Sequence, residues 1–118
     1  MNPILTIEGI SFAGKTTLTK LLEYQGFGRI YELAEKFDFG ARFPPFPSNH
    51  AEAIISDEWF VNQEIVRDRD TLESALTRKT ICDRSFISGL AFSYARQTVF
   101  KLGDVTRQHA HIRKVVQE

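Results

Sequence analysis

The feature that most constrains this chain is a glycine-rich loop near its start, from Gly9 to Thr16 in the segment IEGISFAGKTT. The loop matches the pattern G-x-x-x-x-G-K-[ST] without a gap. Its glycines allow successive backbone N–H groups to turn toward an anion, and Lys15 is placed to reach the terminal phosphates of a nucleotide. The Thr16 hydroxyl is placed to help hold Mg²⁺. The loop therefore predicts a nucleotide-phosphate site.

The segments on either side of the loop support this prediction. Ile4 to Ile7 is a short run of β-branched and apolar residues, which is typical of a buried parallel strand. After the loop, leucines recur at helical spacing as far as Gly26, a residue suited to ending a helix. A strand, a glycine loop and a helix thus follow in the required order, with the positive end of the helix dipole toward the anion.

The remaining chain alternates strand and helix patterns. We predict strands at 29–33 and 80–83, and helices at 49–78, 85–100 and 105–118. Asn49 followed by Glu52 is typical of a helix cap. The apolar residues of the helix at 49–78 predict one inward face, formed by Ile54, Val61, Ile65, Leu72 and Leu76. This order of elements predicts an α/β fold with a parallel sheet and crossover helices.

A long proline-rich loop interrupts that alternation. It spans residues 34–48 and carries four phenylalanines among three prolines, which exclude a regular helix or central strand there. Loops of this length in compact domains are often functional, and Phe43 is our candidate for a substrate contact. The alternative is that these phenylalanines cover the core.

Composition limits the classes of protein that the chain can belong to. Its 118 residues are enough for a single domain, and hydrophobic residues at 42% with charged residues at 25% are typical of a globular protein. Lysine plus arginine equals aspartate plus glutamate at 15 each, which predicts neither a nucleic-acid partner nor a membrane partner. A single cysteine, Cys82, and no secretion signal favour the cytoplasm. We interpret Cys82 as a core residue.

Polar residues follow each predicted strand, and parallel strands bring such residues to one edge of the sheet. Glu32 lies at the end of the second predicted strand, Glu35 follows it, and Asp83 ends the third. Asp83 could join Thr16 in holding Mg²⁺, and Arg84 suits a phosphate or a charge that develops during transfer. Either glutamate could accept a proton from a hydroxyl group. The alternative for Asp83 is a helix N-cap.

Two motifs resemble those of a known family. IEGISFAGKTT is similar to the phosphate loop of thymidylate kinases, E-G-I-D-G-A-G-K-T-T. TICDRSFISGLAFSYA resembles their third-strand segment, D-R-[YS]-x-x-S-x-x-A-[YF], which deoxynucleoside kinases share loosely as E-R-S. Together the two matches cover about a quarter of the chain.

The resemblance implies a P-loop NTPase-type, three-layer α/β/α fold with strand order 2-3-1, and it implies roles for individual residues. Lys15 and Thr16 would bind the ATP phosphates and Mg²⁺, Asp83 would be the carboxylate near the metal, and Arg84 would contact the phosphoryl acceptor. Glu32 would be the glutamate that closes the second strand, with Glu35 as the competing candidate. The nucleotide-binding set is Gly9, Ile10, Ser11, Phe12, Ala13, Gly14, Lys15, Thr16 and Thr17.

The family also places a substrate-binding arginine in the helix at 49–78. Arg67 and Arg69 are the candidates, and the spacing from Ile65 and Leu72 favours Arg69 on the inward face. The alternative is an exposed ion pair with the neighbouring aspartates.

The chain also departs from the thymidylate kinase pattern. Ser11-Phe12 replaces Asp-Gly, Ser93 replaces a thymine-reading glutamine, and the segment Arg-Glu-Pro-Gly-Gly is absent. The family's fourth strand, arginine-bearing lid and fifth strand have no counterpart. We therefore expect residues 1–118 to be a single P-loop domain that is truncated before strands 4 and 5, as the N-terminal fragment of a longer domain or as a reduced relative. The uncovered first strand would then favour self-association, including a homodimer.

These observations predict an ATP- and Mg²⁺-dependent kinase that phosphorylates a nucleoside or a nucleoside monophosphate. One alternative is a regulatory ATP-binding module without kinase activity. Another is a kinase for a different small-molecule hydroxyl group. A guanine-reading N-K-x-D motif is absent from the sequence, which favours ATP over GTP.

Overall fold

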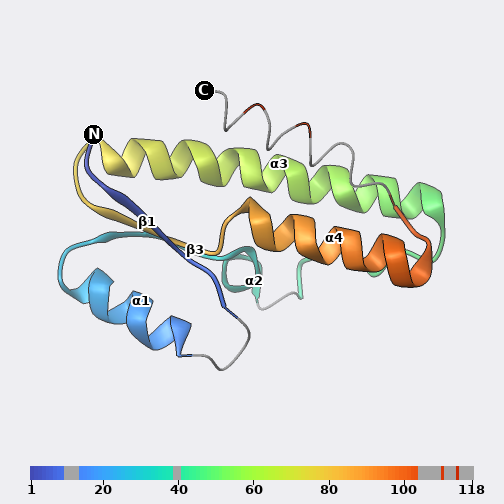
Figure 1. The fold of residues 1–118 in the computed structure, drawn as a ribbon, viewed down its shortest axis with the longest axis horizontal. Coiled ribbons are helices and arrows are strands. Elements are labelled where there is room, and N and C mark those ends of the chain that lie inside the picture. The colour runs from blue at the N-terminus through green and yellow to red at the C-terminus, as the bar shows by residue number, and fades with distance from the viewer. Residues whose placement is uncertain (10–13, 39–40, 104–109, 111–113, 115–118) are drawn as a thin grey trace. The chain divides into compact units, whose positions relative to one another are not determined.

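The computed structural model describes residues 1–9, 14–38, 41–103, 110 and 114 (Figure 1). The elements in chain order are β1 (Ile4–Ile7), α1 (Lys15–Tyr24), β2 (Gly28–Ile30), α2 (Leu33–Lys36), α3 (His50–Ala75), β3 (Thr80–Asp83) and α4 (Phe86–Phe100). The predictions for Ile10, Ser11, Phe12 and Ala13 lie outside the described residues. So does almost all of the helix predicted at 105–118.

The three described strands form a parallel sheet in the order β1-β3-β2, which is the expected order 2-3-1. Ile7 is aligned with Asp83, and Ile30 is aligned with Cys82. Because all strands run the same way, their C-terminal ends lie at one edge of the sheet. The prediction of an α/β fold with a parallel sheet is confirmed.

Burial differs sharply between the central strand and the first strand. Every residue of β3 is buried, and Ile81 lies in the core. In β1, by contrast, Ile4 is 38% exposed and Leu5 is 49% exposed, so the prediction of a buried first strand was wrong. The reason is topological: β3 pairs on both sides, whereas β1 pairs with β3 alone among the described strands.

The glycines that flank α1 have the backbone geometry that the sequence predicts. Gly14 caps the N-terminus of the helix with φ of 86°, a left-handed conformation that side chains disfavour. Gly26, after the end of the helix, has φ of 99°. The helix predicted after the glycine loop is therefore confirmed.

The segment after β2 differs from its prediction. The strand ends at Ile30, and the short helix α2 replaces the predicted end of the strand and the start of the loop. Its residues, Leu33-Ala34-Glu35-Lys36, all favour helix, and Lys36 N–H donates to the Glu32 carbonyl at 3.1 Å. Local helix propensity therefore prevails here over the continuation of the strand.

The long helix α3 begins as predicted. The Glu52 N–H donates to Asn49 Oδ1 at 2.9 Å, and the Glu52 carboxylate accepts from Ser48 N–H and Oγ at 2.8 Å each. This pair of reciprocal bonds resembles a capping box, although the returning bond reaches Ser48 rather than Asn49. The helix ends at Ala75 rather than near Arg78, where the chain forms a turn.

The inward face predicted for this helix was wrong over its second half. Ile65, Leu72 and Leu76 are exposed, whereas the buried positions there include Arg67, Thr71 and Ala75. The buried face is set by polar side chains whose hydrogen bonds are satisfied inside the protein. Apolar periodicity cannot locate such a face.

The chain comprises two compact units, each formed by two segments. The first unit contains 1–42 and 65–85, and the second contains 43–64 and 86–118, so α3 contributes to both. In the second unit, Phe43 makes edge-to-face contacts with Trp59 and Phe60. The helix predicted at 85–100 is confirmed as α4. None of the helices in the described ranges combines the length and apolar character needed to cross a bilayer.

Candidate functional site

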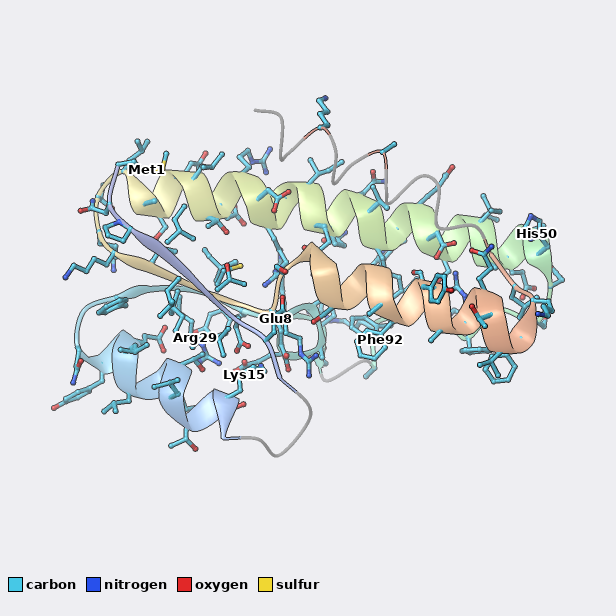
Figure 2. The ribbon with its side chains drawn as sticks, viewed as in Figure 1. Met1, Glu8, Lys15, Arg29, His50 and Phe92 are labelled. Carbon is cyan, nitrogen blue, oxygen red and sulfur yellow. The ribbon has the colours of Figure 1, made fainter. Side chains whose placement is uncertain are left out.

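The candidate site lies in the first unit, where polar residues follow the C-terminal ends of the strands. The glycine loop follows β1, Glu32 comes two residues after β2, and Asp83 ends β3. Figure 2 shows Lys15 and Arg29 between α1 and the strands, with Glu8 at the end of β1. The predicted convergence of these strand ends is thus present in the structure.

Lys15 is the first residue of α1, and its ammonium group joins two of the predicted carboxylates. Its Nζ donates to Glu32 Oε2 at 3.0 Å and to Asp83 Oδ1. Lys15 is buried and Asp83 is wholly buried. The helix start, the end of β3 and the segment after β2 are therefore tied together by charge-assisted hydrogen bonds.

Arg84 contributes the second cation of the site. Its Nε donates to Glu32 Oε2 at 2.7 Å, the same oxygen that Lys15 contacts. Arg84 has φ of 63°, a left-handed conformation that is uncommon for a residue with a side chain. The backbone at the end of β3 is therefore turned sharply just where the site residues lie.

Arg29 is a third cation, which the sequence analysis did not identify. Its Nη2 donates to Glu35 Oε2 at 2.8 Å and to Asp83 Oδ2 at 3.3 Å, and its side chain is 2% exposed. The guanidinium carbon lies 4.5 Å from the centroid of the Tyr31 ring. An arginine inside a strand of a parallel sheet, where strands are usually covered on both faces, requires carboxylate partners, and that signal was present in the sequence.

These contacts form one row of alternating charges, which we name the charge chain. Its members in order of contact are Glu35, Arg29, Asp83, Lys15, Glu32 and Arg84. These three cations and three carboxylates sum to zero, and the more exposed Glu23 lies beside the row with its Oε1 3.8 Å from Arg29 Nη1. Lys15 stands near the middle, so each carboxylate beside it also has an arginine partner.

The charge chain alters the acidity of Glu32. Burial alone raises the pKa of this carboxyl group, but hydrogen bonds from Lys15 and Arg84, together with their positive charges, more than offset that effect. The pKa of Glu32 is therefore lowered from its ordinary value of 4.5. At neutral pH its side chain is a carboxylate able to accept a hydrogen bond or a proton.

The two arginines predicted to bind substrate lie differently from the expectation. Arg69 is exposed, so its assignment to the inward face was wrong. Arg67 is buried and donates to the backbone carbonyls of Tyr31, Asp83 and Arg84 at 3.0, 2.6 and 2.7 Å. These bonds fix the ends of β2 and β3, because a guanidinium group presents several donors in a rigid plane.

Glu8 is another residue that the sequence analysis did not identify. Its Oε1 accepts hydrogen bonds from the backbone N–H and the hydroxyl group of Ser85. Both oxygens of Asp83, in turn, pair with cations on α1 and β2. The alternative interpretation of Asp83 as the cap of α4 therefore has no support from its contacts.

The remaining predicted residues are placed as follows. Thr16 and Thr17 are exposed in the first turn of α1 and Gly9 is half-buried, whereas Phe43 belongs to the second unit. Cys82 is a buried free cysteine, as its assignment to the core predicts. Within the described residues, no group of three or more His, Cys, Asp or Glu side chains is arranged to hold a metal ion.

The second unit holds a buried ion pair of its own. Arg96 on α4 pairs through Nη2 with Asp57 Oδ1 on α3, and Ser93 Oγ donates to the same oxygen at 3.3 Å. Asp57 is almost completely buried. Gly103, with φ of 90°, approaches this pair closely.

Comparison of the chain with protein-family models, with curated proteins and with solved structures found no match. The resemblance to thymidylate kinases therefore rests on its two short motifs. The geometry of the charge chain is a separate observation, since it depends on contacts and not on sequence similarity.

Proposed function

We propose that this chain acts as an ATP-dependent kinase that transfers the γ-phosphoryl group of Mg-ATP to a hydroxyl group of a nucleoside or nucleoside monophosphate. The observation that carries the proposal is the position of Lys15. It lies directly after the glycine loop and contacts both a carboxylate at the end of β3 and a glutamate beyond β2. Lys15 would then lie between the phosphate site and the acceptor site.

The ATP phosphates would bind at the start of α1. Gly14 has the left-handed backbone that lets the loop turn there, and the first turn of α1 contains no acidic residue. The positive end of the helix dipole is therefore not neutralised by a neighbouring carboxylate in that turn. Lys15 would supply the side-chain charge for the terminal phosphates.

The residues at this position fit a magnesium ion of the kind that accompanies ATP. Mg²⁺ in such sites uses one or two protein ligands and completes its coordination with phosphate and water, so a larger cluster of acidic residues is unnecessary. Thr16 would offer its exposed hydroxyl group, and Asp83 would offer its carboxylate. When bound, the ion neutralises charge on the transferring phosphoryl group.

The acceptor would lie beside Glu32 and Arg84. Glu32 is a carboxylate at neutral pH, so it can accept a hydrogen bond from an acceptor hydroxyl and orient it. Its lowered pKa makes it a weak base, so the proton would pass to it only as the phosphoryl group arrives and the hydroxyl oxygen becomes acidic. Arg84 holds Glu32 through its Nε and adds a positive charge suited to an acceptor phosphate. Glu35 is the second candidate for the base, and it contacts Arg29.

Titration calorimetry with Mg-ATP, followed by a screen of nucleosides and nucleoside monophosphates for ADP production, tests the proposal. We expect ATP binding and at least one acceptor that raises ADP production. Asp83→Asn should lower turnover more than about tenfold with a small change in thermal stability. The control is Asp38→Asn, which alters an exposed carboxylate paired with Arg42 outside the charge chain.

Each outcome of this test is informative. ATP binding without any acceptor among nucleosides and nucleotides would contradict the acceptor class and would favour a regulatory ATP-binding module or a kinase for another alcohol. A chain that does not bind ATP would contradict the phosphate site. Equal turnover in the parent and in Asp83→Asn would remove Asp83 from the mechanism.

A further inference from the structure

Lys15 has two competing sets of partners in the proposed function. In the structure its ammonium group contacts Glu32 and Asp83, whereas a bound nucleotide would draw it toward phosphate. Asp83 is wholly buried, and a buried carboxylate that loses its cation strongly destabilises the folded protein. The binding of phosphate by Lys15 therefore depends on what else neutralises Asp83.

Arg29 is the second cation on Asp83. It contacts Oδ2, while Lys15 contacts Oδ1, so the two cations occupy different oxygens of one carboxylate. Arg29 is held in place by Glu35 at 2.8 Å and by the face of the Tyr31 ring, neither of which involves Lys15. Its position is thus fixed before any rearrangement of Lys15.

If Lys15 donated its hydrogen bonds to a phosphate instead, the charge chain would separate into two groups, each of which contains an arginine. Glu32 would keep Arg84, and this pair would be neutral. Asp83 would keep Arg29, which it shares with Glu35 and, at 3.8 Å, with Glu23, and this group would have a net charge of −2. No buried carboxylate of the charge chain would be left without a cation, and the residual negative charge would lie where a metal ion accompanies the phosphates.

We propose that Arg29 is a positioning residue of the phosphate site, which keeps Asp83 paired and in place so that Lys15 can turn to the nucleotide. This inference rests on the proposed function. Arg29 acts through Asp83 and does not touch the nucleotide. Without Arg29, Lys15 would be the sole cation on Asp83, and the carboxylate would compete more strongly with phosphate for the ammonium group.

The bulk of the side chain alone explains Arg29 poorly. Its buried Nε has no hydrogen-bond partner within the described part of the chain. A buried donor without a partner is destabilising, and an apolar side chain of similar length would avoid that cost. The charge of Arg29, rather than its bulk, therefore accounts for an arginine at this position.

A double-mutant cycle of Arg29→Met and Asp83→Asn on the full chain tests the inference. ATP affinity is measured by calorimetry, both with magnesium and in EDTA, for the parent, the two single variants and the double variant. We expect Arg29→Met to weaken ATP binding about tenfold or more, as for loss of a hydrogen bond to a charged group. In the Asp83→Asn background the same change should weaken binding less than about threefold, because no carboxylate charge remains to be neutralised.

Two further variants separate this role from a loss of folding. Arg29→Lys keeps the charge and should recover most of the affinity lost in Arg29→Met, with thermal unfolding measured on each protein. Arg42→Met is the matched control, since Arg42 is an exposed arginine of the same unit that pairs with Asp38. It should bind ATP like the parent.

The results distinguish this inference from the proposed function. If the parent binds ATP and Arg29→Met binds equally well, or is weakened equally in both backgrounds, the role of Arg29 is refuted while the proposed function stands. If Arg29→Lys binds as poorly as Arg29→Met although it is folded, the charge argument is also refuted. A parent chain that binds no ATP under either condition overturns both.

Discussion

The two units of the molecule use buried charges in different ways. In the first unit, six charged residues form a row in which Asp83 and Glu32 each contact two cations. In the second unit, one arginine on α4 pairs with one aspartate on α3, with a serine hydroxyl beside them. The first arrangement can lose its central cation and leave every carboxylate paired, whereas in the second the loss of Arg96 removes the guanidinium group that contacts Asp57.

This difference provides a physical criterion for separating a candidate binding site from a structural ion pair. A ligand site has to release a charged group to its ligand without unfolding, so it benefits from duplicate partners. A structural pair needs no such duplication, and truncating either member is strongly destabilising. Substitution of one cation in each unit therefore tests the criterion directly.

Lys15→Met should have the largest effect, and the effect should fall on activity. We expect kcat/KM for the proposed transfer to fall about a thousandfold, which is the upper range for the loss of one donor that stabilises developing charge. The free energy of unfolding should fall by no more than about 1–2 kcal/mol, because Arg29 and Arg84 still pair with the two carboxylates. Steady-state kinetics and chemical denaturation measure the two quantities. A variant that unfolds but retains its activity per folded molecule would reverse the interpretation.

Arg96→Met should show the opposite pattern in the second unit. Removing the guanidinium group from the buried Asp57 should lower the free energy of unfolding by about 3–4 kcal/mol. Because Arg96 lies outside the charge chain, ATP affinity of the folded fraction should match that of the parent. Arg96→Lys should restore part of the stability. Denaturation curves that coincide with the parent's would show that this pair contributes little.

Two glycines with left-handed backbones extend the comparison. A Cβ on Gly103 would lie 2.5 Å from Arg96 Nη2 and 2.9 Å from Asp57 Oδ2, whereas a Cβ on Gly14 would meet nothing within 4 Å. We expect Gly103→Ala to cost about 2–3 kcal/mol of stability, from backbone strain and steric overlap together. Gly14→Ala should cost about 1 kcal/mol from strain alone.

Gly26→Ala provides the matched control for this pair. Gly26 has φ of 99° and equally open surroundings, but it lies at the other end of α1 from the glycine loop. It should resemble Gly14→Ala in thermal stability and the parent in ATP affinity. Equal stability of Gly103→Ala and Gly26→Ala would show that the ion pair moves aside easily.

Features that depend on residues close together in the sequence were predicted well, and features that depend on distant residues were mostly not. The strand at Ile4–Ile7, the strand at Thr80–Asp83 and the glycine-capped helix depend on local patterns, and all three are confirmed. The predicted convergence of Lys15, Glu32 and Asp83 followed from the rule that parallel strands end at one edge.

The features that the sequence analysis missed depend on contacts between distant residues. Arg67 is buried because three backbone carbonyls from two strand ends accept its hydrogen bonds, and no periodicity encodes such a partner. The same holds for Glu8 and Ser85, which are separated by 77 positions along the chain. The spacing of apolar residues instead predicted that Arg69 faces inward, because it assumed that the face carrying Ile65 and Leu72 is the buried one.

The smallest expected effect concerns acid stability, and it contrasts Glu32 in the first unit with Glu52 in the second. The pKa of each carboxyl group is lowered from 4.5. Burial raises the pKa of Glu32, but hydrogen bonds and positive charges from Lys15 and Arg84 lower it by a larger amount. The pKa of the exposed Glu52 is lowered by hydrogen bonds from Ser48. A lowered pKa in the folded state means that each group stabilises the fold above pH 4.5 and loses that contribution as the pH falls through the folded value.

Lys15→Met separates the two glutamates in a single experiment. Removing Lys15 takes away one hydrogen bond and one positive charge at Glu32, so Glu32→Gln should flatten the acid loss of stability more in the parent than in the Lys15→Met background. Glu52→Gln should have the same effect in both backgrounds, because its hydrogen bonds come from Ser48. Urea denaturation at a series of pH values from about 7 down to about 3 measures the difference. An equal effect of Glu32→Gln in both backgrounds would mean that Lys15 does not share its charge with Glu32 in solution, and the charge chain would then be broken at its centre.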